Sequence, residues 1–229
     1  MARQLTFDLA GDPAHARSDF LVAGANRLAL ATLDAPGTWP QGRMLLIGEA
    51  GAGKTHLASF WAVEQDAERI PGRMLLPEMT DALAFDGGAL VVEDAHRVGG
   101  LPEAEQALFH LWNLCHARDC KLLLTARTPP RDWGLGLPDL RSRMDAMPQI
   151  RIDAPDETLL AAVLVKLCAD RQLPVPSAVI DWLVLRMDRD LGLARKLVEA
   201  LDQAAMSDQK PVSRRLAAEL LDKLATADA

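Results

Sequence analysis

One octapeptide constrains the fold of this chain more than any other feature: Gly48-Glu49-Ala50-Gly51-Ala52-Gly53-Lys54-Thr55. An apolar stretch, Met44 to Ile47, precedes it, and the residues after it have the apolar spacing of an amphipathic helix. A glycine-rich turn between a buried strand and a helix directs backbone amides, and the positive end of the helix dipole, toward one point. The sequence therefore predicts a strand, a tight loop and a helix in direct succession.

The octapeptide fits the P-loop pattern G-x-x-x-x-G-K-[ST] at each fixed position. In this motif the amides surround a phosphate, the lysine reaches the β- and γ-phosphate oxygens, and the threonine hydroxyl binds magnesium. An accidental glycine-rich turn is the alternative, and the flanking strand and helix argue against it. We therefore expect ADP or ATP with magnesium, bound by Gly48, Gly51, Ala52, Gly53, Lys54, Thr55 and His56.

Composition limits the other chemistry of the chain. Its 229 residues suffice for one large domain or for a medium and a small one. The three cysteines include no C-x-x-C pair, and no secretory signal or long apolar run is seen, so we expect a cytoplasmic protein without membrane contact. His110, Cys115, His116 and Cys120 are spaced so that they fall on different sides of a helix, which disfavours a metal site.

The charge balance argues against strong binding to duplex DNA. The formal net charge is −7, from 25 Lys and Arg against 32 Asp and Glu, and no dense basic run interrupts it. Tight binding to the phosphate backbone needs many cationic contacts. Net charge does not describe a local patch, so a basic face stays compatible with it. We expect contact with DNA to be only indirect or weak.

Apolar segments alternate with helical stretches over the first two thirds of the chain. The clearest helix covers Pro102 to Arg118, with apolar residues three and four apart. This alternation predicts a three-layer α/β domain with a five-stranded parallel sheet, whose ligands bind at the carboxyl ends of the strands. The predicted strands are 43–47, 73–76, 89–92, 121–125 and 149–152.

After Pro155 the pattern contains helices only, so a small all-helical domain is expected there. A serine cap is predicted at Ser177. The predicted helices are 156–171, 177–187, 191–205 and 213–224. We therefore expect a tail at 1–15, a nucleotide-binding α/β domain at 16–154 and a helical lid domain at 155–229.

Polar residues end two of the predicted strands. Glu93 and Asp94 follow the strand 89–92, where one carboxylate would bind magnesium and the next would polarise water. Thr125 ends the next strand and could bond a γ-phosphate or the attacking water. Ordinary charge at a loop end and ordinary turn chemistry are the alternatives.

An ordered series of short motifs resembles the AAA+ ATPases, and within them the DnaA family of bacterial replication initiators. The similarity runs from about Asp19 to Leu201. It implies that Glu93 and Asp94 form the Walker B pair with Glu93 binding magnesium, and that Thr125 lies in sensor 1. It also implies that Arg143 is the arginine finger and Arg195 the sensor 2 arginine. The series is Phe20-Leu21-Val22-Ala23-Gly24-Ala25-Asn26, the P-loop, Glu93-Asp94, Leu123-Leu124-Thr125-Ala126-Arg127-Thr128-Pro129-Pro130, Leu140-Arg141-Ser142-Arg143 and Ala194-Arg195-Lys196-Leu197.

The hexapeptide Gln4-Leu5-Thr6-Phe7-Asp8-Leu9 is similar to peptides that bind the DNA polymerase sliding clamp, its β subunit. Gln4 would bond polar groups at the rim of the clamp pocket. Leu5, Phe7 and Leu9 would contribute about 1.5–3 kcal/mol each when fully buried, before the costs of ordering. An edge strand with alternating apolar residues is the alternative.

Initiators of this family carry a DNA-binding domain after the lid and a helicase-interaction domain before the ATPase. Neither is expected in this sequence, so the chain resembles the clamp-bound regulators of the family. That resemblance implies stimulated hydrolysis of DnaA-bound ATP, which limits re-initiation, and weak turnover by the chain itself, with ADP favoured. A self-assembling ATPase or loader, and a nucleotide-responsive interaction module without catalysis, are the alternatives; the formation of homo-oligomers stays open.

Overall fold

A computed structural model describes residues 16–208 and 212–227. Five parallel strands form one sheet in the order β2-β3-β4-β1-β5. This arrangement confirms the predicted α/β class and the five-stranded parallel sheet. The strands are β1 (Arg43–Ile47), β2 (Glu68–Pro71), β3 (Ala89–Glu93), β4 (Lys121–Ala126) and β5 (Gln149–Arg151).

The second strand differs from the prediction. The sequence placed it at 73–76, whereas the structure has the strand at Glu68–Pro71 and a 3-10 turn, η4, at Gly72–Met74. The prediction followed the apolar residues Met74 to Leu76. The actual strand lies at the edge of the sheet and buries only Ile70, so it carries almost no apolar signal.

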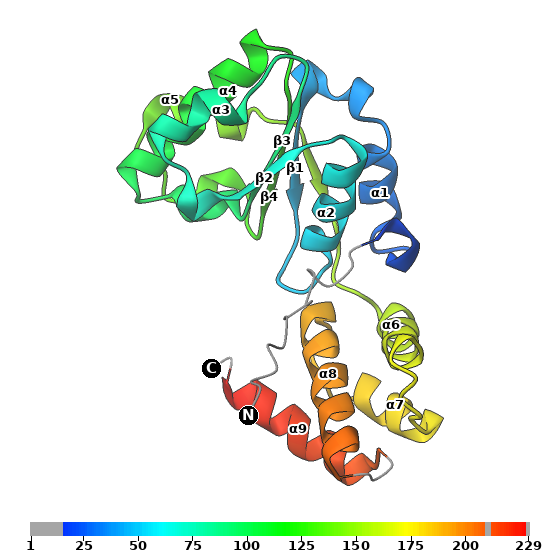
Figure 1. The fold of residues 1–229 in the computed structure, drawn as a ribbon. Coiled ribbons are helices and arrows are strands. Elements are labelled where there is room, and N and C mark those ends of the chain that lie inside the picture. The colour runs from blue at the N-terminus through cyan, green and yellow to red at the C-terminus, as the bar shows by residue number, and fades with distance from the viewer. Residues whose placement is uncertain (1–15, 209–211, 228–229) are drawn as a thin grey trace, which may run out of the picture.

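Helices cover both faces of the sheet (Figure 1). Alternate residues of a strand point to opposite faces, and in β1 the side chains of Leu45 and Ile47 pack with α4 while Met44 and Leu46 pack with α2. Because both faces of the sheet are therefore apolar and each is covered by helices, the domain has three layers. The helices are α1 (Arg27–Leu33), α2 (Lys54–Glu64), α3 (Thr80–Leu83), α4 (Pro102–Ala117) and α5 (Pro138–Asp145).

The remaining described helices lie below the carboxyl ends of the strands in Figure 1 and have a core of their own. Asp156 caps the first of them by accepting a bond from the amide of Leu159 at 2.7 Å. The serine cap predicted at Ser177 is wrong, because Pro176 occupies the capping position and Ser177 is already helical. These helices are α6 (Glu157–Asp170), α7 (Ser177–Val184), α8 (Leu191–Asp208) and α9 (Arg214–Ala227).

The division of the chain at Pro155 stays a prediction, although β5 is the last strand in the described part. Among the described residues, no helix combines the length and apolar content that crossing a bilayer requires.

Candidate functional site

The glycine-rich loop follows β1 at the carboxyl edge of the sheet and leads directly into α2. Lys54 is only 7 % exposed, and its Nζ donates to the carbonyl oxygens of Gly48 and Glu49 at 2.7 Å each. Burial lowers the pKa of the Lys54 ammonium, while the negative charge of Asp94 partly opposes this shift. A buried ammonium has lost most of its hydration. An anion bound beside it would compensate for that loss, so Lys54 favours anion binding at this place.

Backbone geometry explains two of the glycines. Gly51 and Gly53 have φ angles of 69° and 102°, a region that disfavours other residues. Gly53 immediately precedes α2, and the first amides of a helix have no acceptor within it. In the described part of the chain, the amides of Lys54 and Thr55 donate to no acceptor. Together with the helix dipole they form an anion site.

A cavity of about 580 Å³ opens in front of this loop, between the sheet and the helical part. Its size lies within the range of about 300–1,000 Å³ that is usual for small-molecule and cofactor sites. Charged side chains meet apolar ones in its wall, a mixture that suits a ligand with a phosphate group and a flat apolar ring. The residues from the first part of the chain are Asp19, Phe20, Leu21, Asn26, Ala50, Gly51, Gly53, Lys54, Thr55, His56, Asp94 and Arg127.

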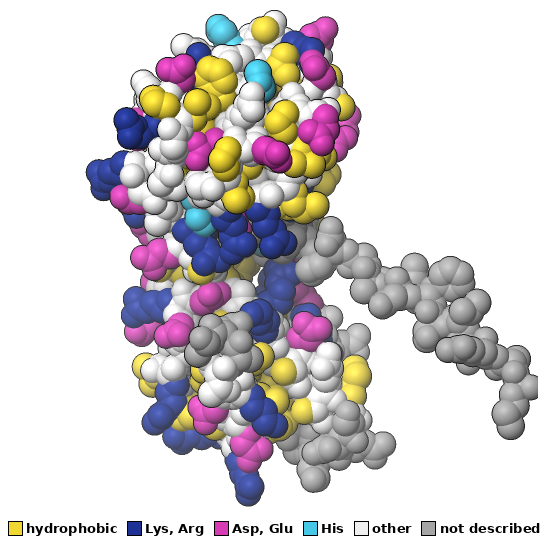
Figure 2. All heavy atoms as spheres, turned by 90° about the vertical axis from the view of Figure 1, so that its left-hand side faces the viewer, with side chains coloured by type: hydrophobic (Ala, Val, Ile, Leu, Met, Phe, Trp, Pro, Cys, Tyr) yellow, Lys and Arg dark blue, Asp and Glu magenta, His cyan; other side chains and the backbone are white. Residues whose placement is uncertain are grey.

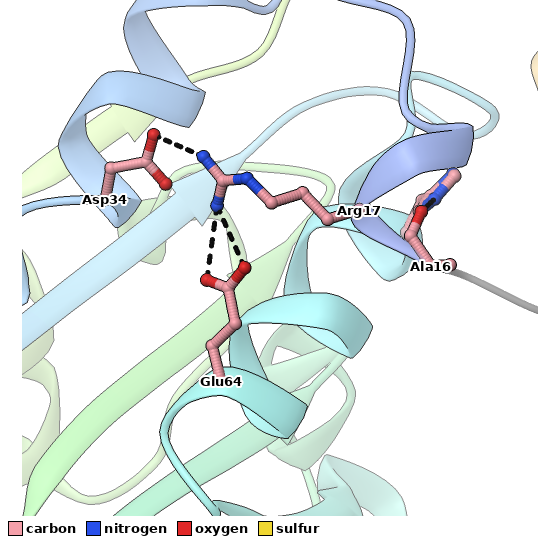
Figure 3. A network of polar contacts seen from close by, with 5 residues as sticks. Ala16, Arg17, Asp34 and Glu64 are labelled. Atoms are coloured by element: carbon pink, nitrogen blue, oxygen red, sulfur yellow. Dashed lines mark hydrogen bonds and ion pairs between the residues drawn. The ribbon is translucent and has the colours of Figure 1, made fainter.

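The segment before α1 forms one wall of the cavity and is tied down at several points. Arg17 bonds Asp34 at the end of α1 and Glu64 at the end of α2 (Figure 3), and these bonds raise the pKa of its guanidinium, most through Asp34. The His56 Nε2 lies 3.1 Å from the carbonyl oxygen of Ala16. These contacts join residues 16–19 to the helix that begins at the P-loop.

The apolar part of this wall surrounds Phe20. Its ring lies edge-on to the rings of His56, at 5.3 Å between centroids, and Phe60, at 5.6 Å. Burial lowers the pKa of His56, and the bond to Ala16 opposes this shift. Asn26 is 3 % exposed and bonds the backbone of Ala23 and Leu21, both at 2.8 Å, which fixes the turn into α1.

The helical part closes the cavity from the other side through α8. The Leu191 amide donates to the Gly51 carbonyl at 3.0 Å, and a Cβ atom on Gly51 would lie 2.0 Å from Asp190 Oδ1. The same Oδ1 accepts a bond from the Leu193 amide at 2.9 Å. Arg195, one turn further along α8, is half-buried and lines the cavity. The P-loop and the start of α8 are therefore in direct contact.

The structure separates the two carboxylates that end β3. Asp94 lines the cavity and also a smaller cleft of about 220 Å³, whereas Glu93 lines the smaller cleft and is ion-paired with Arg69 of β2. Thr125 is 2 % exposed, and its hydroxyl accepts a bond from the Asp94 amide at 3.0 Å. Asp94 has a φ of 49°, so this bond stabilises an unusual backbone conformation. Thr125 therefore positions Asp94 and does not itself line the cavity.

Two further residues of the loop lie behind the cavity wall. A Cβ atom on Gly48 would lie 2.5 Å from Ile152, and Ala52 is 4 % exposed within the core. Both residues shape the loop without lining the cavity. The four residues of the clamp-like peptide, Gln4, Leu5, Phe7 and Leu9, lie outside the described residues.

Arg143 lies away from this cavity, in the last turn of α5. Its Nη1 donates to Asn113 Oδ1 of α4 at 2.7 Å, and its guanidinium carbon lies 4.7 Å from the centroid of the Phe109 ring. The side chain is half-exposed. The structure thus brings Lys54, Thr55, Asp94 and Arg195 to one cavity and leaves Arg143 at another place on the surface.

Sequence reasoning gave no role to several cationic residues near the cavity. Arg127 directly follows β4 and is exposed, and Lys166 and Arg171 reach the cavity from α6 and its end. Figure 2 shows Lys and Arg side chains gathered at the waist between the sheet and the helical part. Arg127, Lys166 and Arg171 lie far apart in the sequence or outside any basic run, so a search for contiguous basic runs could not find them.

The fold resembles that of known nucleotide-binding proteins. Domain III of the Thermotoga maritima replication initiation protein DnaA superposes with a TM-score of 0.79 at 19 % identity, covering 93 % of this chain and 97 % of that one. The fold is that of the DnaA AAA+ domain. AMPPCP-bound DnaA from Aquifex aeolicus gives a TM-score of 0.65 at 18 % identity, over 85 % of this chain and 66 % of that one.

A RuvB variant from Thermotoga maritima gives a TM-score of 0.64 at 19 % identity, over 86 % of this chain and 66 % of that one. No family model matches the sequence. The structural comparisons therefore show a DnaA-like AAA+ fold. At these sequence identities they support no conclusion beyond the fold.

Proposed function

We propose that this protein is a nucleotide-binding AAA+ regulator of chromosome replication, of the kind represented by Hda. The observation that carries the proposal is the separation of two sites. A cavity with a P-loop and a lid arginine is assembled within one chain, while Arg143 lies at a distant, half-exposed position. An arginine in that place does not reach the cavity of its own chain, and in this proposal it would serve a nucleotide held by another subunit.

ADP or ATP fits the cavity by the chemistry of its walls. Lys54 and the unpaired amides of the first turn of α2 would bind the phosphates, and Arg195 would approach them from α8. The apolar wall around Phe20 suits the base. Because α8 also contacts Gly51 directly, the ligand would couple the loop to the position of the helical part.

Magnesium would be bound by the Thr55 hydroxyl and by Asp94, completed by phosphate oxygens and water. Asp94 lines the cavity and Thr55 is exposed within it, whereas the Glu93 carboxylate is engaged with Arg69. The metal would neutralise phosphate charge. Since Thr125 is occupied by the Asp94 amide and Glu93 by Arg69, turnover in this chain would be slow.

In this proposal Arg143 acts on ATP bound to DnaA. Its guanidinium would stabilise the charge that develops on the transferred phosphoryl group, an effect worth about 10³–10⁵ in rate for arginine fingers elsewhere. The peptide containing Gln4, Leu5, Phe7 and Leu9 would attach the protein to the sliding clamp and so bring it to newly replicated DNA. The outcome would be inactivation of DnaA after initiation.

One reconstituted experiment tests this function. The protein is captured by clamp loaded on DNA, ATP-bound DnaA is added, and the DnaA-bound ATP and ADP are measured with time. We expect conversion to ADP that depends on both the clamp and this protein. Without any effect on DnaA-bound ATP the regulator function is refuted, and strong basal hydrolysis with ATP-dependent self-assembly would instead indicate a loader.

The clamp attachment has its own test. Replacing Gln4, Leu5 and Phe7 together by alanine should abolish capture by the clamp while nucleotide binding is unchanged. If capture persists, the N-terminal peptide is not the attachment site.

A further inference from the structure

Three residues of α4 contact α5 or the segment that leads into it. Glu105, Phe109 and Asn113 follow one another at a spacing of four, which places them along one side of the helix. Glu105 is buried and the other two are partly buried. None of them lines the nucleotide cavity.

Glu105 fixes the segment that enters α5. Glu105 is 4 % exposed, and its carboxylate accepts three backbone bonds, from the amides of Gly100 at 3.0 Å, Gly136 at 3.1 Å and Leu137 at 2.8 Å. A buried carboxylate is unfavourable unless such donors surround it. Because α5 begins at Pro138, the charge also lies at the positive end of that helix. The start of α5 is thereby fixed against α4.

Phe109 and Asn113 hold the side chain that α5 carries near its end. Nη1 of Arg143 donates to Asn113 Oδ1 at 2.7 Å, and the guanidinium carbon lies 4.7 Å from the centroid of the Phe109 ring. Within the described part of the chain, the Nε and Nη2 of Arg143 donate to no acceptor. A guanidinium held along one edge keeps its other edge for phosphate oxygens.

We infer that Asn113 and Phe109 are positioning residues for Arg143, and that Glu105 fixes the helix on which Arg143 stands. The inference rests on the proposed function of Arg143. A free arginine side chain must lose rotamer freedom to reach a reacting phosphate, whereas this one is already ordered at the surface. Such preorganisation lowers the barrier of the chemical step and leaves the docking of the two proteins unchanged.

The test uses the full chain on clamp-loaded DNA with ATP-bound DnaA. Asn113→Ala should lower the maximal rate of hydrolysis of DnaA-bound ATP about tenfold, the loss expected for one charge-assisted hydrogen bond. Phe109→Leu should lower it about two- to fivefold, the loss expected for a cation–π contact at an exposed site. The concentration of regulator that gives half the maximal rate should not change. Asn113→Asp keeps an acceptor oxygen and should restore most of the rate.

Gln106→Ala is a matched control, because Gln106 is an exposed carboxamide of the same helix with no side-chain hydrogen bond in the described part. It should leave the rate unchanged. In an Arg143→Ala background, Asn113→Ala should cause no further loss. Thermal unfolding of each variant verifies that the chain is folded; since replacing buried Glu105 can unfold the chain, the test depends on Asn113 and Phe109.

Two failures can be told apart. If Arg143→Ala leaves hydrolysis unchanged, the proposed function of Arg143 is wrong. If Arg143→Ala abolishes stimulation but Asn113→Ala and Phe109→Leu hydrolyse at the full rate, the positioning role is wrong and the function stands.

Discussion

The nucleotide cavity and the edge that carries Arg143 are built in opposite ways. The cavity is enclosed by the P-loop, by residues 19–26 and by α6 and α8, and its lysine is 7 % exposed. Among the described residues, those of α4 hold the Arg143 side chain, which is half-exposed. In Figure 1, α5 and α2 lie on opposite faces of the sheet.

Under the proposed function, the cavity is a complete site, whereas the edge with Arg143 is half of a site that another protein completes. A nucleotide can be bound by residues of one chain, because loop and lid meet in it. Arg143 does not line that cavity, so under the proposed function it would act on a nucleotide held by a second protein. Substitutions should therefore affect nucleotide binding or the stimulation of DnaA, and seldom both.

The largest effect is expected at Arg143. Arg143→Ala should lower the hydrolysis of DnaA-bound ATP by about 10³-fold or more, the range of other arginine fingers. Nucleotide affinity of the chain, measured by calorimetry, should be unchanged. Arg141→Ala, an exposed arginine of the same helix, is the control; equal losses in both variants would mean that charge at this edge matters more than one placed guanidinium.

At Lys54 we expect the opposite pattern, in which nucleotide binding is the property that is lost. Lys54→Ala should weaken ADP or ATP binding about 100-fold, since it removes a buried charge-assisted contact worth about 1.5–3 kcal/mol and the bonds that shape the loop. Calorimetric titration measures the loss, and Lys223→Ala, at an exposed lysine of α9, is the control. Retained affinity would show that the loop does not bind the phosphates.

The contact between loop and lid should respond to Gly51→Ala. The new methyl group would strain a backbone with φ of 69° and displace Asp190, so we expect a loss of about 2–3 kcal/mol from conformational strain and a weakened cap. Gly87→Ala separates the two causes, because Gly87 has a φ of 66° with open space around it. Chemical denaturation measures both variants; equal losses would show that Asp190 contributes nothing.

The smallest effect concerns acid stability. Burial lowers the pKa of His56 below 6.5, and the same cause lowers the pKa of His96. Below pH 6.5 the unfolded chain takes up protons that the folded chain does not, so stability should decrease as pH falls from 6.5 toward the folded pKa values. Urea unfolding above and below this pH measures the decrease.

The variant with His56→Gln and His96→Gln should show a smaller decrease than the natural chain. A pH profile identical to that of the natural chain would assign the acid sensitivity to other groups.

Much of the fold could be predicted because its signals are local. The buried strands β1, β3 and β4 are continuous apolar runs, and the P-loop combines residue types that serve one geometry. The edge strand β2 was placed wrongly because only Ile70 is buried there. The formation of an edge strand depends more on its pairing with the neighbouring strand than on its own composition.

The site was harder to predict where distant segments meet. The adjacent residues Glu93 and Asp94 look equivalent in sequence, yet the left-handed backbone of Asp94 directs it to the cavity while Arg69 holds Glu93. Asp190 gave no signal in the sequence, since its contact with Gly51 spans most of the chain.

The sequence by itself determined the glycine-rich loop between β1 and α2, the layered sheet and the helical region after Pro155, because each depends on residues close together along the chain. Only the tertiary structure decided which carboxylate lines the cavity, how α8 contacts the loop, and that Asn113 and Phe109 hold Arg143. These contacts depend on how α4, α5 and α8 pack, and packing joins residues whose separation in sequence carries no periodic signal.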